Sequence, residues 1–98
     1  MFEIRYGADG TVVCTGRLDA QQCEKGQAFM DGIDGVATLD FDKLDYISSA
    51  GLGILLKTQK RLVKNGGAIK IINVNKHIHD VFHFSGFHTI FDIKPKPD

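Results

Sequence analysis

The chain has few cysteines, no long apolar run and no excess of charge of either sign. Its 98 residues include two cysteines, and twelve basic residues balance twelve acidic ones. Two cysteines are too few for a disulfide framework, and a net charge of zero argues against a domain that mainly holds nucleic-acid phosphates. Its apolar stretches fall short of the roughly 20 residues that a membrane-spanning helix needs, and the start lacks the apolar run of a signal peptide. We therefore expect a cytoplasmic protein, with no membrane insertion and no direct contact with nucleic acid.

Length and composition fit one folded domain. The hydrophobic fraction is 43% and the charged fraction 24%, which is ordinary for a globular chain, so we expect a single domain over residues 1–98 with a flexible tail at 94–98. The charges are unevenly distributed: residues 1–49 carry a net charge of −5 and residues 50–98 a net charge of +5. This segregation either creates distinct faces that orient a protein partner or is folded into one mixed surface.

Hydrophobic periodicity predicts strands that alternate with helices. We expect strands at residues 2–6, 11–15, 36–41, 68–72 and 89–93, and helices at 20–30, 50–64 and 75–85. Turn residues at 7–10 join the first two strands into a hairpin, Asp19 is placed to cap the first helix, and Gly86 to end the last. The order predicts an α/β fold: a mostly parallel sheet of four or five strands with an N-terminal β-hairpin and helices packed on it.

The helix at 50–64 shows the clearest pattern. Its expected buried stripe, interrupted by one polar residue, consists of Leu52, Leu55, Leu56, Gln59, Leu62 and Val63. Basic residues follow the same spacing on another face: Lys57, Lys60, Arg61 and Lys64. Such a face is usually solvated, and its alternative role is to steer an acidic partner or a nucleotide phosphate.

Ser48 and Ser49 lie at a junction between a strand and this helix. A helix N-terminus presents unpaired N–H groups and about half a positive charge, so it accepts an anion such as the phosphate of a modified serine. From local chemistry alone, Ser49 is either an N-cap or a functional serine. The sequence contains no G-x-S-x-G motif, no phosphate-binding loop and no convincing base near the serines. We therefore expect no enzymatic activity, no catalytic residues and no cofactor.

Histidines and phenylalanines crowd the last third of the chain. His79 and His83 have the i, i+4 spacing of a zinc-binding pair, but H-E-x-x-H and a nearby cysteine are lacking, so we expect solvent-facing histidines and no metal site. Four phenylalanines are expected to pack in the core and its rim: Phe82, Phe84, Phe87 and Phe91. Phe84 or Phe87, if exposed beside Ser49, could anchor a partner.

Four motifs occur in the order in which the STAS domain family has them. They are Thr15-Gly16-Arg17-Leu18-Asp19 followed by residues 36–41, the segment 44–53 containing Tyr46-Ile47-Ser48-Ser49-Ala50-Gly51-Leu52-Gly53, Asn65-Gly66-Gly67, and residues 81–87. The resemblance covers about Arg5 to Ile93. The chain thus resembles the module of bacterial anti-sigma factor antagonists and of sulphate-transporter tails.

The resemblance implies a partner-switching regulator of transcription. Such an antagonist binds an anti-sigma factor that is also a serine kinase, the kinase ends the complex by phosphorylating the antagonist, and a PP2C-type phosphatase restores it. By position the acceptor is Ser49, with Ser48 the lesser candidate; Ser48 stands where many antagonists have Asp. The implied partner-binding residues are Asp19, Ser48, Ser49, Ala50, Gly51 and Leu52. The alternative is a STAS module that binds a nucleotide or phosphate ligand at this helix N-terminus, or a cytoplasmic subunit of a transport assembly.

Overall fold

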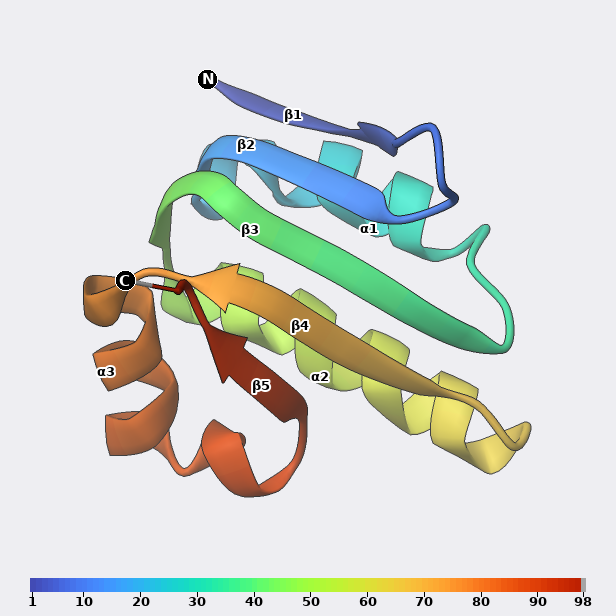
Figure 1. Cartoon of the computed structure of the whole chain (residues 1–98). Helices are drawn as coiled ribbons and strands as arrows, with labels where there is room; N and C mark the ends of the chain where they lie inside the picture. The colour runs from blue at the N-terminus through green and yellow to red at the C-terminus, as the bar shows by residue number, and fades with distance from the viewer. Residues whose placement is uncertain (98) are drawn as a thin grey trace.

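A five-stranded sheet organises the computed structural model, which describes residues 1–97 (Figure 1). The strands are β1 (Phe2–Tyr6), β2 (Val12–Leu18), β3 (Val36–Ile47), β4 (Ala68–Val74) and β5 (Asp92–Pro95), and the α-helices of these residues are α1 (Cys23–Met30), α2 (Ser49–Lys64) and α3 (Lys76–Ser85). The strands lie in the order β1-β2-β3-β4-β5; β1 pairs antiparallel with β2, and the other neighbours are parallel. The predicted fold class, hairpin and element order are confirmed.

The helices cover one face of the sheet. Along β3, Leu39 and Phe41 are buried while Asp40 between them is partly exposed, as alternation on a half-covered sheet requires. Phe41 stacks on Phe82 of α3, with ring centroids 6.5 Å apart, and α1 and α2 lie side by side behind the sheet in the view of Figure 1. The core therefore lies between this sheet face and the helices. Within residues 1–97, no helix combines the length and apolar character that crossing a membrane requires.

The strand boundaries differ from the predicted ones. β2 extends to Leu18 and β3 to Ile47; β2 passes through Gly16 at φ 93°, a left-handed conformation that glycine adopts without strain, and the pairing with β3 shifts register there. The last strand starts later than expected because residues 87–89 form a 3₁₀ turn, η2.

The segment expected to be a flexible tail begins inside β5. Lys94 and Pro95 belong to this strand. The Lys96 backbone N–H donates to the Val74 carbonyl at 2.9 Å, and the Lys96 ammonium lies 2.9 Å from an Asp42 carboxylate oxygen. Only the call for Asp98 lies outside the described residues. The expectation of a flexible tail is therefore wrong for residues 94–96.

The buried stripe of α2 is rotated from the predicted one. Ile54 and Thr58 are buried, whereas Val63 is 54% exposed, because α1 packs against the side of α2 that carries Ile54. Gln59 is buried as expected, and it is fully bonded: its amide nitrogen donates to the Ile90 carbonyl at 2.9 Å, and its amide oxygen accepts from the Ile69 N–H at 2.7 Å. A buried polar side chain is tolerated when it is satisfied in this way.

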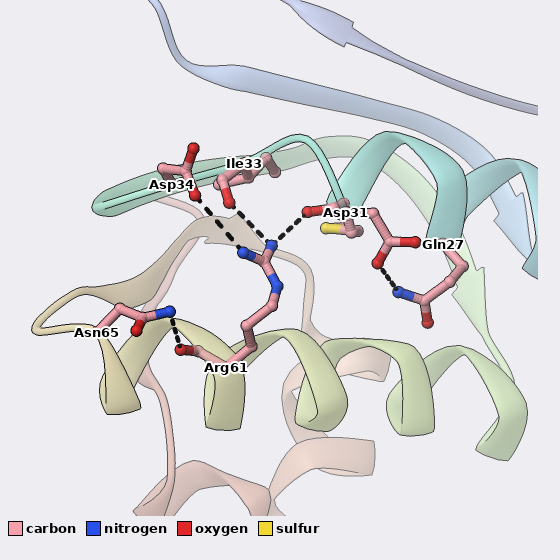
Figure 2. A network of polar contacts seen from close by, with 7 residues as sticks. Gln27, Asp31, Ile33, Asp34, Arg61 and Asn65 are labelled. Carbon is pink, nitrogen blue, oxygen red and sulfur yellow. Dashed lines mark hydrogen bonds and ion pairs between the residues drawn. The ribbon is translucent and has the colours of Figure 1, made fainter.

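Arg61, predicted to lie on a solvated face, instead ties α2 to the end of α1 (Figure 2). Its guanidinium donates to the backbone carbonyls of Met30 and Ile33, both at 2.8 Å, and lies 3.6 Å from a carboxylate oxygen of the exposed Asp34. Met30 is the last residue of α1, where helix carbonyls lack intrahelical partners and a cation is favourable. The link fixes the turn that leads from α1 into β3.

Aromatic residues around α3 are divided between core and surface. Phe82 and Phe91 are buried, Phe87 packs against the core, and Phe84 is 89% exposed, so the expected packing of Phe84 is wrong. His83 stacks on His88, with ring centroids 4.2 Å apart. Among residues 1–97, no group of three or more histidine, cysteine, aspartate or glutamate side chains is arranged to hold a metal ion.

Candidate functional site

The two serines lie at the carboxyl ends of β2 and β3, where the chain enters η1 (Ala20–Gln22) and α2. The Ser48 N–H donates to the Leu18 carbonyl at 2.9 Å, and Leu18 is the register partner of Ile47. Asp19 and Ser49 each follow one member of the bonded pair, so both start from neighbouring positions at one edge of the sheet. The structure thus brings Asp19 next to the serine segment in the fold, 29 residues before Ser48 in the chain.

The first turn of α2 is packed tightly against this junction at Gly51. A Cβ added to Gly51 would lie 2.8 Å from the Leu18 carbonyl oxygen and 2.8 Å from Cγ1 of Ile47. These separations are shorter than van der Waals contact, and a backbone oxygen cannot move aside as a flexible side chain can. Glycine is therefore needed for α2 to begin where it does, and the start of the helix is held against β2 and β3.

The N-cap of α2 is Ser48, not Ser49 as predicted. Ser48 has extended backbone angles, and its hydroxyl oxygen accepts from the Gly51 N–H at 3.1 Å, as an N-cap does. Ser49 is the first helical residue and is exposed. Among residues 1–97, no side-chain hydrogen bond uses the Ser49 hydroxyl. The tether of Ser48 to Leu18, which lies 30 residues away in the sequence, decides which serine caps.

Replacing Ser48 by alanine is expected to lower the free energy of unfolding by about 1 kcal/mol, because the Gly51 N–H loses its partner. Ser49→Ala is expected to change it by less than about 0.5 kcal/mol, as for other exposed positions. Urea unfolding of the two variants, followed by circular dichroism, measures both values. A larger loss for Ser49→Ala than for Ser48→Ala would contradict this assignment of the cap.

The six predicted partner-binding residues divide by exposure. Ser49 and Ala50 are exposed, and Ser48 and Asp19 are partly buried. Gly51 and Leu52 are buried, so these two position the helix rather than offer a surface. Asp19 caps η1, with a carboxylate oxygen accepting from the Gln21 N–H at 3.1 Å.

Sequence reasoning missed two neighbours of the site. The Arg17 guanidinium lies over the Tyr46 ring, 4.3 Å from its centroid, and the two residues are register partners on β2 and β3. They directly precede the pair Leu18 and Ile47, so they border the serine segment. Tyr46 was part of the motif, but its stacking on Arg17 depends on the pairing of β2 with β3, which the sequence does not reveal.

The site offers a modifiable hydroxyl rather than an activated nucleophile. Three pockets of about 410, 470 and 200 Å³ lie on other parts of the surface, and none is lined by residues 48–52. Cys14 is a buried strand residue, as expected; burial, with a smaller effect from the Asp40 charge, raises the pKa of its thiol to about 12, so it stays protonated and unreactive. Cys23 is partly buried and its thiol lies 3.3 Å from the Asp19 carbonyl.

Comparison with known proteins gives consistent matches. A family model described as "STAS domain" matches residues 14–98. BtrV of Bordetella bronchiseptica, named as an anti-sigma factor antagonist, is 36% identical over 74 residues, which are 76% of this chain and 58% of BtrV. The anti-sigma-B factor antagonist of Bacillus subtilis is 33% identical over 55 residues, which are 56% of this chain and 50% of that protein. The chain therefore spans between half and three fifths of the length of these curated relatives.

The structure also matches that of the Bacillus cell fate determinant SpoIIAA in its phosphorylated form. The TM-score is 0.67 at 24% sequence identity, over 95% of this chain and 90% of that one. At this identity the match reports a shared fold. Because the family model covers most of the sequence and the fold agrees with it, the chain belongs to the STAS domain family.

Proposed function

We propose that this protein is an anti-sigma factor antagonist, a cytoplasmic regulator that binds an anti-sigma serine kinase and is released when Ser49 is phosphorylated. The observation that carries the proposal is the contrast between the two serines: Ser48 is bonded to Gly51, while Ser49 is exposed on a fixed helical turn. The names of BtrV and of the anti-sigma-B factor antagonist support the partner class, and the phosphorylated form of SpoIIAA supports the switch.

The switch needs no change of fold. The kinase transfers the γ-phosphoryl group of ATP to the Ser49 oxygen, the hydroxyl loses its proton, and ADP leaves. The new group adds about −1.5 to −2 charges in the first turn of α2, where the helix N-terminus tolerates them. The domain therefore remains folded while the binding surface changes from a neutral hydroxyl to a dianion. A PP2C-type phosphatase reverses the step by hydrolysis and releases inorganic phosphate.

A capture experiment tests the proposal. Tagged wild-type protein and Ser49→Asp are incubated with lysate of the source organism, and captured proteins are identified by mass spectrometry. We expect the wild type to retain a protein with a serine-kinase domain and Ser49→Asp to lose it. Adding ATP to the captured complex should then place one phosphate on Ser49, mapped by mass spectrometry of the peptides.

The same experiment identifies failure. If neither bait retains a serine kinase, the antagonist function is wrong and titration with nucleotides becomes the next measurement, because it tests the ligand-binding alternative. If a kinase is retained but phosphorylates Ser48, the partner class stands and the assignment of the acceptor is wrong.

A further inference from the structure

The second half of α2 borders an apolar groove that the proposed function does not use. The groove has a volume of about 470 Å³ and lies between α2 and the end of η2; it is lined by Leu56, Gln59, Lys60, Val63, Lys64 and Ile90. Val63 is 54% exposed and Ile90 is 40% exposed. Two large aliphatic side chains thus face solvent at a hollow in the surface, where burying them against a partner would be favourable.

The walls of the groove are held in place by Gln59. Its amide bonds the Ile90 carbonyl on one side and the Ile69 N–H of β4 on the other, at 2.9 and 2.7 Å. Because α2, β4 and the end of η2 are joined through one buried side chain, the spacing between Val63 and Ile90 is set before any partner arrives. A preformed groove loses less conformational entropy on binding than a flexible one.

The rim of the groove is positively charged. Lys60 and Lys64 line it and Lys57 lies one turn before Lys60, while α2 carries no acidic residue. The ion pairs found within residues 1–97 use other cations: Lys25, Arg61 and Lys96. The lysines of the groove therefore have no carboxylate within ion-pair distance in the described part of the chain, and their charge is available to a partner.

We propose that this groove docks an acidic amphipathic helix of a partner protein. Apolar residues at i, i+3 or i+4 and i+7 of such a helix would contact Val63 and Ile90, and its flanking carboxylates would lie near Lys60 and Lys64. Leu56 follows Ser49 by seven residues, about 10 Å along the helix axis. The groove is thus a second surface beyond the proposed switch, and it keeps its affinity whether or not Ser49 is modified.

The test uses a synthetic helical peptide of 15 residues with leucines on one face, glutamates on both flanks and one tryptophan. The protein has no tryptophan, so peptide fluorescence reports binding alone, and NMR spectra of the protein locate it. We expect saturable binding, with shifts concentrated at Leu56, Val63 and Ile90. The double variant Lys60→Glu/Lys64→Glu should weaken binding about tenfold, since two attractive charges become repulsive.

Matched controls separate the groove from net charge. Lys43→Glu/Lys70→Glu makes the same change in net charge at exposed positions of β3 and β4 and should keep the affinity within about twofold. The same peptide with lysines in place of glutamates should not bind. Ser49→Asp should bind the acidic peptide as the wild type does, so this result is independent of the capture experiment.

Four outcomes would overturn the proposal: no saturable binding of the acidic peptide, equal binding of both peptides, NMR shifts away from the groove, or equal losses in the two double variants. Sedimentation equilibrium without peptide tests the other occupant. Self-association that Lys60→Glu/Lys64→Glu abolishes would assign the groove to a second copy of this chain, and the partner-helix proposal would be wrong.

Discussion

Phosphorylation of Ser49 is expected to weaken the binding of the anti-sigma kinase by about a hundredfold, which corresponds to about 2.8 kcal/mol. The reason is local: a dianion replaces an exposed neutral hydroxyl on a turn that Gly51 holds against Leu18, so the turn cannot move to relieve the repulsion. Ser49→Asp adds one charge and a shorter side chain, and we expect about a tenfold loss. Ser49→Ala should bind as the wild type does. Calorimetric titration of the purified partner measures all four affinities.

Ser48→Asp provides a control one residue away. It makes the same charge change as Ser49→Asp, but aspartate is a good N-cap and its carboxylate would occupy the place of the Ser48 hydroxyl, which faces the Gly51 N–H. We expect this variant to keep the wild-type affinity within a few-fold and to remain fully folded. If Ser48→Asp and Ser49→Asp lose the partner equally, the binding surface responds to charge at the helix start in general, and Ser49 has no special position in it.

Short-range chemistry made much of the fold predictable. The hairpin follows from the turn residues between two alternating runs, and β1 and β2 form it. The ends of α3 follow from side chains adjacent to them: Asn75 accepts from the Ile78 N–H at 2.8 Å, and Gly86 ends the helix at φ 79°. Each of these features is decided within about four residues, which is the range that a sequence pattern describes.

Features decided by distant contacts were not predictable in the same way. Two adjacent serines both suit an N-cap, and only the bond from Ser48 to Leu18 distinguishes them. Gln59 interrupts an apolar stripe because its partner, Ile90, lies 31 residues later. Arg61 fits the spacing of a solvated basic face, yet two backbone carbonyls about 30 residues earlier bind it. A periodicity argument assigns a face to each residue, but it does not reveal which partners that face meets.

Replacing Arg61 by methionine is expected to lower the free energy of unfolding by about 2–3 kcal/mol, since two carbonyls lose hydrogen bonds from a charged donor. The Arg61 side chain is 35% exposed, so water reaches the carbonyls only in part. Methionine retains the aliphatic contacts of the stem, which isolates the loss of the guanidinium. For a domain of this size the melting temperature should fall by about 10 °C or more. Thermal and urea unfolding measure both quantities.

Two further variants separate the carbonyl contacts from the ion pair shown in Figure 2. Asp34 is 94% exposed and 3.6 Å from the guanidinium, so Asp34→Ala should cost less than about 0.5 kcal/mol, as exposed ion pairs do. Arg61→Lys keeps the charge but lacks the planar fork that reaches Met30 and Ile33 together, and it should lose an intermediate amount. If Asp34→Ala proves as costly as Arg61→Met, the ion pair rather than the capping of α1 holds these elements together. The expected ranking, methionine worst and the Asp34 variant mildest, means that α2 fixes the entry into β3 through backbone carbonyls. That same helix presents Ser49 at its first turn, so its attachment to α1 contributes to the rigidity on which the proposed switch depends.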